Sequence, residues 1–251
     1  MVSCYATPLG GCSPVQTREH YLSRSVLELI HKAPIIDGMP GIDNPKRIGV
    51  ASLASKILCD AHNHSLSHLD SAAVSFFGAL QRFDHELGAR SKNDERVYVR
   101  GEFLERWLLK IAFGLTATNR LAGRGAAIRD EDHMLEVLFG RRDFPKNWGL
   151  YVDAQLGDRY AAPANLAITT HLNPEGELTY LRAWCRFVPL SLALGQPDHL
   201  APAMRRPAEI RLTRSDSRGT KVLGLKWADA KQHEAVEFTR SGEMTGWAPL
   251  P

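Results

Sequence analysis

The first third of the chain contains apolar residues at helical spacing, separated by polar loops. One stripe predicts a helix over residues 18–33, which ends before a loop rich in glycine and proline. Residues 52–59 fit a short strand or a helical turn. A second stripe predicts a helix over residues 67–83. Its expected buried positions are Leu69, Ala73, Phe76, Phe77 and Leu80.

Helical spacing continues in the middle of the chain. Residues 100–115 and 130–139 predict two more helices, and the second ends at the polar, proline-containing residues 141–147. The first of these helices carries large apolar side chains that we expect to pack in the core: Phe103, Trp107, Leu108 and Ile111.

After residue 150 the pattern changes to short runs rich in Val, Ile, Thr and aromatic residues, which is typical of strands. Turn sequences separate the runs, such as NPEG at 173–176 and SDSRG at 215–219. The sequence therefore predicts an α+β protein in three parts. These are an N-terminal unit over residues 1–85, a helical region over 86–148, and a β-rich domain over 149–251 that is a candidate for substrate or partner binding.

The composition is that of an ordinary globular protein. The chain is 44% hydrophobic and 24% charged, and no run approaches the roughly 18 consecutive apolar residues of a membrane span. The first residues lack the basic start and apolar core of a signal peptide. We therefore expect a cytoplasmic protein without a membrane partner.

Residues 205–226 contain seven Lys or Arg and only two acidic residues. Positive charge is therefore concentrated there, although the net charge of the whole chain is only +3. Basic side chains attract nucleic acid because counterions are released from its phosphates. The candidate phosphate contacts are Arg205, Arg206, Arg211, Arg214 and Lys221. The alternative is a solvated basic surface without a partner.

Three of the four cysteines lie early in the chain, where they are candidates for metal binding. Cys59 and His62 are spaced C-x-x-H, so both can reach one tetrahedral ion where a turn enters a helix. Cys4 and Cys12 would complete a Cys3His site, whose soft ligands suit a structural Zn²⁺ better than magnesium or calcium. The alternative is that Cys4 and Cys12 lie in a mobile N-terminus and that Cys59 is an ordinary buried thiol.

An acid next to a histidine, Glu19-His20, lies between the two halves of this ligand set, and Asn63 directly follows His62. Over residues 4–85 the chain resembles the HNH endonuclease family, whose core is a ββα-metal unit related to treble-clef zinc fingers. The resemblance implies an HNH-like N-terminal unit stabilised by zinc. The rest of the chain resembles only uncharacterised bacterial proteins.

The resemblance also implies a mechanism for hydrolysing a phosphodiester bond. His20 would be the general base that takes a proton from water, since a neutral imidazole has a suitable pKa. Glu19 and Asn63 would offer oxygen ligands to one catalytic Mg²⁺ or Mn²⁺ ion, whose charge stabilises the transition state. His64 and His68 would face solvent or contact phosphate, with a metal-binding pair as the alternative.

The same residues have structural interpretations. His20 could begin a helix that has Glu19 in its first turn, and Asn63 could cap the helix that begins near residue 65. Asp70 is expected to accept a structural hydrogen bond, with a role as a third metal ligand as the alternative.

The expected function is metal-dependent cleavage of nucleic acid, DNA rather than RNA. The alternative is a zinc-stabilised module that binds nucleic acid or protein without cutting, which needs the zinc ligands but not the acid, base and amide together. The family's middle asparagine has no clear equivalent, and Asn44 and Ser52 are the nearest candidates. A third interpretation is a small-ligand site in the β-rich domain, but the chain lacks a glycine-rich phosphate loop and the G-x-S-x-G and H-E-x-x-H motifs.

Overall fold

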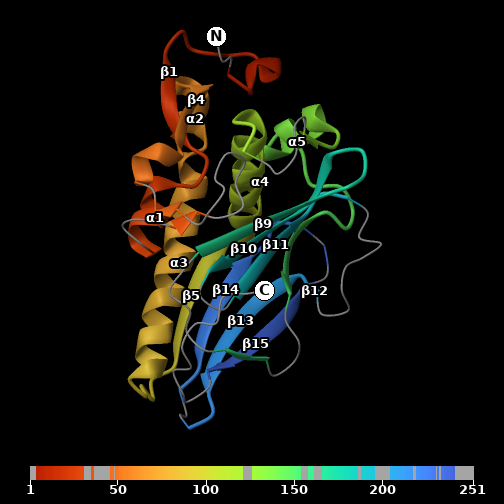
Figure 1. Cartoon of the computed structure of the whole chain (residues 1–251). Coiled ribbons are helices and arrows are strands. Elements are labelled where there is room, and N and C mark those ends of the chain that lie inside the picture. The colour runs from red at the N-terminus through yellow and green to blue at the C-terminus, as the bar shows by residue number, and fades with distance from the viewer. Residues whose placement is uncertain are drawn as a thin grey trace.

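The computed structural model describes most of the chain, and its fold is mixed α+β (Figure 1). The described residues are 4–30, 35–36, 46–47, 49–120, 126–153, 158–160, 166–185, 188–195, 204–216, 219–229, 231 and 233–240. Helices α3 and α4 lie beside the sheets, and the N-terminal elements gather at one end of these helices (Figure 1). No helix within the described residues is both long and apolar enough to cross a membrane.

The N-terminal elements are built around an antiparallel strand pair that leads into a helix. Strand β1 (Gln16–His20) pairs with β4 (Ala54–Cys59), and β4 continues directly into α2 (Asp60–Ser65) and then α3 (Ser67–Gly88). The smaller elements around them are η1 (Thr7–Leu9), α1 (Arg24–Ile30), β2 (Ile35–Ile36), β3 (Lys46–Arg47) and η2 (Val50–Leu53).

The helix predicted over residues 18–33 begins later than expected. Residues 18–20 belong to β1, and α1 starts only at Arg24. Residues 18–20 pair with β4 through backbone hydrogen bonds, so they form a strand and not the first turn of a helix. Glu19 and His20 are therefore on a strand, and the prediction that they begin a helix is wrong.

The β1–β4 ladder contains a bulge just before this acid and histidine. The register changes between Thr17 and Glu19, so that Lys56 and Ile57 of β4 together face Arg18. An extra residue on one strand bends it and changes the direction of the following side chains. On β1, which has no extra residue, neighbouring side chains point to opposite faces, so Glu19 is buried while Arg18 is exposed.

Two large sheets, together with helices α4 and α5, make up the rest of the described helices and strands. The six-stranded sheet has the order β12-β7-β11-β10-β6 with β9 paired to β10, and the five-stranded sheet has the order β5-β14-β13-β15-β8. The strands of the first sheet are β6 (Ala127–Ile128), β7 (Gly149–Asp153), β9 (Leu166–Leu172), β10 (Glu177–Cys185), β11 (Val188–Ala193) and β12 (Met204–Arg205). Those of the second are β5 (Glu95–Arg100), β8 (Asp158–Tyr160), β13 (Pro207–Arg214), β14 (Lys221–Lys226) and β15 (Glu234–Arg240).

Helix α4 (Gly101–Ala117) packs against α3, α5 (Glu131–Leu138) and strands of both large sheets. The expected buried positions of α3 and α4 are confirmed, except that Phe103 is only partly buried. The three predicted parts share this core: the 85/86 boundary falls inside α3, and β5 and β6 of the middle region join the two large sheets.

A glycine lets α4 approach the segment that follows β1. A Cβ atom at Gly114 would lie 2.5 Å from the Cβ of Tyr21 and 3.0 Å from its Cα, closer than packed atoms approach. This close contact brings α4 under β1, where its one fully buried lysine, Lys110, meets Glu19.

Candidate metal centre and adjoining pocket

The four predicted zinc ligands come together at the start of α2. Cys4, Cys12, Cys59 and His62 each offer an atom, and these atoms all lie within 4.8 Å of one another. The Nδ1 atom of His62 is 3.5 Å from the sulfur of Cys4, 3.6 Å from that of Cys12 and 3.2 Å from that of Cys59. The alternative of a separate N-terminal arm and an unrelated buried thiol does not hold in this structure.

Local backbone structure explains this convergence. Cys59 ends β4 and is the N-cap of α2, so His62 projects from the first turn of that helix. On the other side, the amide of Thr7 donates to the carbonyl of Cys4, and the short helix η1 then ends at Gly10. Gly10 has a φ of 72°, which favours glycine and lets the chain turn back toward Cys12.

The geometry fits a tetrahedral zinc ion. Zinc binds sulfur and nitrogen at distances that place the two ligand atoms about 3.6 Å apart. The three sulfur-to-nitrogen distances are close to that value. The His62 ring also packs edge-on against Phe139, with ring centroids 5.3 Å apart, which fixes the orientation of the imidazole.

The thiols of this cluster differ in acidity. Burial raises the pKa of Cys59, but hydrogen bonds from the backbone of His62 and Ser13 outweigh burial and bring it down to about 6. Burial raises the pKa of Cys4 to about 11, and the neighbouring Cys12 contributes in the same direction. One sulfur is thus prepared as a thiolate, and a bound cation would favour ionisation of Cys4 as well.

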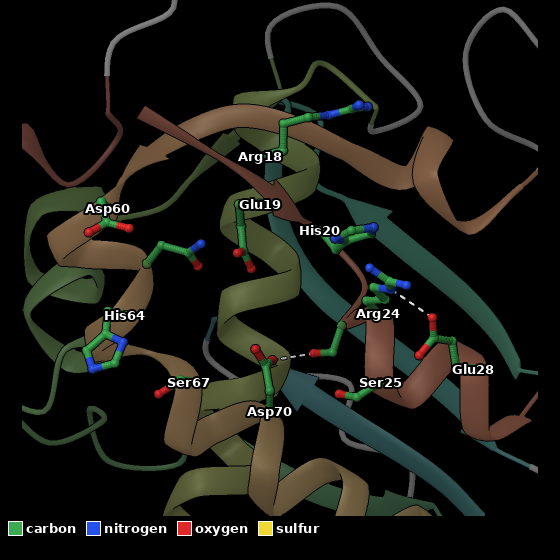
Figure 2. Close-up of a pocket in the computed structure, with 12 residues that line it drawn as sticks. Arg18, Glu19, His20, Arg24, Ser25, Glu28, Asp60, His64, Ser67 and Asp70 are labelled. Atoms are coloured by element: carbon green, nitrogen blue, oxygen red, sulfur yellow. Dashed lines mark hydrogen bonds and ion pairs between the residues drawn. The ribbon is translucent and has the colours of Figure 1, made fainter. Parts of the chain in front are cut away.

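A pocket of about 440 Å³ adjoins this centre. Figure 2 shows Glu19 pointing into it, between a side formed by α2 with Asp60 and His64 and a side formed by α1 with Arg24 and Glu28. The complete lining is Arg18, Glu19, His20, Ser23, Arg24, Ser25, Glu28, Asp60, Asn63, His64, Ser67 and Asp70. The predicted acid, base and amide therefore line one pocket.

Two carboxylates share a single buried ammonium group at the pocket floor. The Nζ atom of Lys110 lies 2.6 Å from Glu19 Oε1 and 2.8 Å from Asp70 Oδ2. The hydroxyl of Ser23 donates to Asp70 and in turn accepts a 2.7 Å hydrogen bond from the indole of Trp107. Asp70 thus accepts structural hydrogen bonds, as expected from the sequence.

The charges of this group are strongly influenced by burial. Burial raises the pKa of Glu19, and the nearby Lys110 and the hydrogen bond from Asn63 offset this only in part. Burial also lowers the pKa of Lys110, but Asp70 and Glu19 outweigh it and raise the pKa above its ordinary value. Lys110 is therefore a fixed positive charge between two carboxylates, which leaves the group with an excess of negative charge when both are ionised.

His20 lies at the pocket rim in a form suited to accepting a proton. Its Nε2 atom is buried and has no hydrogen-bond partner. Burial lowers the pKa of His20, and the positive charges of Arg24, Arg18 and Lys110 lower it further. The imidazole is therefore neutral at neutral pH.

Asn63 faces β1 from α2. Its Nδ2 atom donates a 3.0 Å hydrogen bond to Thr17 Oγ1, and its side chain also bonds to Glu19. The alternative that Asn63 caps the next helix is wrong, because it lies within α2 and its side chain bonds across to β1. The amide instead connects the metal-bearing helix to the strand that carries the acid and histidine.

Sequence reasoning missed Lys110, although the sequence contained a signal. A lone charge in the apolar run LLKIAFGL needs buried partners, because an unpaired ammonium in a core is very costly. Its partners are 91 and 40 positions away, at Glu19 and Asp70, and only the fold brings them together.

Three of the predicted phosphate-binding cations are structural instead. Arg206 is buried and paired with Glu105 at 3.1 Å and Asp229 at 3.4 Å. Arg214 and Lys221 are also buried; their carboxylate partners are Asp216 for Arg214, and Glu86 and Glu95 for Lys221. Because their charges are already paired inside the fold, the prediction that these three bind nucleic acid is wrong.

The other predicted contacts remain at the surface. Arg205 pairs with Glu234 at 3.2 Å and Arg211 with Glu209 at 2.9 Å, and both arginines keep part of their side chains in solvent. His64 and His68 are exposed.

The two candidates for the family's middle asparagine do not line the pocket. Ser52 is exposed in η2 and is not among the lining residues, and Asn44 lies outside the described residues. Compared with known proteins, the chain matches no family model, no curated protein and no solved structure.

Proposed function

We propose that this protein is a metal-dependent endonuclease with an HNH-like N-terminal unit, and that it hydrolyses phosphodiester bonds of DNA. One observation carries the proposal: Glu19, His20 and Asn63 line one pocket beside a Cys3His cluster. Strand β1 carries the acid and histidine and pairs with β4, which leads into α2 with Asn63; this strand pair and helix resemble a ββα-metal unit with α1, β2, β3 and η2 between its two strands.

His20 is assigned the role of general base. An attacking water must lose a proton, and a neutral imidazole at the pocket rim can accept it. The unpartnered Nε2 atom of His20 supports this role, because its lone pair is available for a proton. His133 and His233 also have an Nε2 atom without a hydrogen-bond partner, but neither lines the pocket.

Glu19 and Asn63 are assigned to a catalytic Mg²⁺ or Mn²⁺ ion. Their hard oxygen atoms suit these ions, and the excess negative charge around Lys110 favours a second cation. When bound, the ion would offset negative charge on the phosphate. Lys110 holds the Glu19 carboxylate from below, and Asn63 holds it from the side.

A structural Zn²⁺ is assigned to Cys4, Cys12, Cys59 and His62. This ion would join the N-terminal turn to the β4–α2 junction and so fix Asn63 relative to His20. The ligand set has no position left for chemistry, which is typical of structural zinc.

A second candidate is a zinc-stabilised module that binds nucleic acid without cutting. The ion pair between Lys110 and Glu19 favours it, because an ammonium group already occupies one oxygen of the proposed acid ligand. The two candidates share the zinc centre and differ only in whether the pocket reacts.

The test is cleavage of plasmid and single-stranded DNA with Mg²⁺ or Mn²⁺ and then with chelator. We expect His20→Ala to reduce cleavage by about a hundredfold or more, the usual contribution of a general base. His85→Ala is the matched control, because His85 is an exposed histidine at the far end of α3 and should cut like the wild type.

Equal cleavage by wild type and His20→Ala would show that the assigned base is wrong. Binding of DNA without cleavage by either protein, with a steep salt dependence, would favour the non-cutting module.

A further inference from the structure

The five-stranded sheet presents an exposed aromatic side chain at its β5 edge. Among the described residues, Tyr98 and Val15 are the two large apolar side chains that remain mostly exposed, and Tyr98 is 54% exposed. A Cβ atom at Gly224 of the neighbouring strand would lie 2.5 Å from Tyr98 Cδ1. The phenol ring therefore lies across the backbone of β14 at Gly224, with aromatic surface in solvent.

Cations surround this ring. Lys226 Nζ is 4.8 Å from the ring centroid, and the guanidinium of Arg96 is 5.8 Å from it and donates to the Tyr98 hydroxyl at 3.3 Å. Glu209 lies among them and pairs with Arg96 at 2.5 Å and with Arg211 at 2.9 Å. This carboxylate reduces, but does not cancel, the positive charge beside the aromatic ring.

The same kind of side chain continues from the sheet toward the pocket. Lys226 is the strand partner of Arg100, whose guanidinium lies 3.9 Å from the centroid of the Phe103 ring. Arg100 also pairs with Glu102 at 2.5 Å, but its side chain is mostly exposed. The Phe103 ring meets the His68 ring at 4.6 Å, and His68 is four residues from His64, which lines the pocket. We call the residues Tyr98, Lys226, Arg100, Phe103 and His68 the aromatic strip.

We infer that the aromatic strip binds single-stranded nucleic acid and leads it to the pocket. Unpaired bases stack on exposed aromatic side chains, and cations between the aromatic residues contact the phosphates. The strip contains both kinds of group, with Lys226 and Arg100 between the rings of Tyr98 and Phe103. In a duplex the faces of the bases are already stacked, so it would gain little from Tyr98.

Strand binding by the strip does not depend on the chemistry of the pocket. Delivery of the strand for cleavage rests on the proposed nuclease function. The two inferences therefore need separate measurements.

The test is fluorescence anisotropy of a labelled oligothymidylate, and of a duplex of the same length, titrated with the full-length protein. We expect the single strand to bind more tightly. Tyr98→Ala should weaken single-strand binding by about tenfold, the usual effect of losing one stacked base. Val15→Ala removes the other exposed large apolar side chain and should bind like the wild type.

The charged members of the strip allow a second measurement. Lys226→Gln should weaken binding and reduce the slope of log affinity against log salt by about 0.7, the value for one lost phosphate contact on a single strand. Lys92→Gln, an exposed lysine in the turn before β5, should leave the slope unchanged.

A third variant should act in the opposite direction. Glu209→Gln removes the carboxylate that pairs with Arg96 and Arg211, so single-strand affinity should rise by a few-fold. A general structural defect would not strengthen binding.

Two results would overturn the inference: no binding of the single strand at low salt, or unchanged binding by Tyr98→Ala. Equal, Tyr98-dependent binding of duplex would overturn the preference for single strands. If the wild type binds the strand through Tyr98 but cuts nothing, the aromatic strip stands and the nuclease proposal fails. If Tyr98→Ala cuts plasmid normally and only its strand binding is lost, both stand.

Discussion

Two buried lysines, Lys110 and Lys221, differ in what surrounds them. Each is almost fully buried and each meets two carboxylates. The partners of Lys221 are partly exposed, and Arg82 also pairs with both, so two positive charges face two negative ones. At Lys110 one positive charge faces two carboxylates; Asp70 is partly exposed, but Glu19 is almost as buried as the lysine.

The difference separates a structural ion pair from a candidate site. Around Lys221 the charges are balanced, and solvent can take up any that lose their partner. Around Lys110 the negative charge is in excess, and a histidine nitrogen without a partner lies at the rim. Buried charge that its neighbours leave unbalanced is typical of functional sites.

Loss of the metal centre should have the largest effect on stability. It should destabilise the elements next to Lys110 and leave those next to Lys221 unchanged. We expect stoichiometric zinc in the purified protein, and loss of it in Cys59→Ser with a cost on the order of 5 kcal/mol or more. Elemental analysis measures the zinc. Hydrogen exchange should show faster exchange in β1, β4 and α2 while β13 and β14 keep their protection.

Cys185→Ser is the control for this experiment, because it keeps all four ligands. Zinc-free wild type with the same protection in β1 and β4 would rule out a structural metal.

The next effect compares the two lysines directly. Lys110→Met should cost about 3–5 kcal/mol, because it leaves the buried Glu19 carboxylate without a cation. Lys221→Met should cost less than about 2 kcal/mol, since Glu86 and Glu95 can turn to solvent. Denaturant unfolding of both variants measures the two free energies.

Added Mg²⁺ or Mn²⁺ should restore part of the stability of Lys110→Met and none of that of Lys221→Met. A divalent ion that binds only the folded state stabilises it through that binding. Equal responses of both variants would mean that the two clusters do not differ as described.

A smaller effect tests the close approach of α4 to β1 without changing any charge. Gly114→Ala should destabilise by about 1–2 kcal/mol, because the clash with Tyr21 exceeds the gain in helix propensity. Gly78→Ala on α3 is the matched control. The nearest atom to its added Cβ is Leu29 Cδ2 at 3.8 Å, so this variant should gain up to about 1 kcal/mol. Thermal unfolding should show shifts of opposite sign.

The smallest effect is the pH dependence of the Lys221 cluster. The hydrogen bond from Lys221 lowers the pKa of Glu86, so ionised Glu86 stabilises the fold above the ordinary pKa of a glutamate. This stability is lost as the pH falls through the lowered pKa. The difference between wild type and Glu86→Gln should therefore shrink in acid, by less than about 1 kcal/mol because solvent reaches the partly exposed carboxylate. A difference that grows in acid would contradict the sign.

Much of the fold can be predicted from the local sequence, because a helix with one apolar face has apolar residues at helical spacing. The stripes of α3 and α4 were sufficient to predict their buried positions, such as Phe76 and Trp107. The C-x-x-H spacing of Cys59 and His62, together with the two cysteines early in the chain, predicted which four ligands meet. In both cases the decisive residues are close in sequence or chemically unusual.

The remainder depended on contacts between distant residues. The sequence of residues 18–20 fits a helix, but in the fold these residues form a strand that is hydrogen-bonded to β4. The sequence alone predicts that Arg206 contacts phosphate. In the fold it instead donates to Glu105, which is one hundred and one positions away in the chain. Charge alone does not distinguish a surface cation from a buried one, because its partner comes from another part of the chain.

The irregularity opposite Arg18 makes the length of β4 critical. If one of the two residues facing Arg18 were deleted, the ladder would become regular, with Thr17 still opposite Leu58 and Glu19 still opposite Ser55, but the local bend and extra twist of the bulge would be lost. The carboxylate at position 19 would then lose its alignment over Lys110, although no residue of the pocket had been altered. A single-codon deletion at position 56 would thus change the pocket more than many substitutions within it.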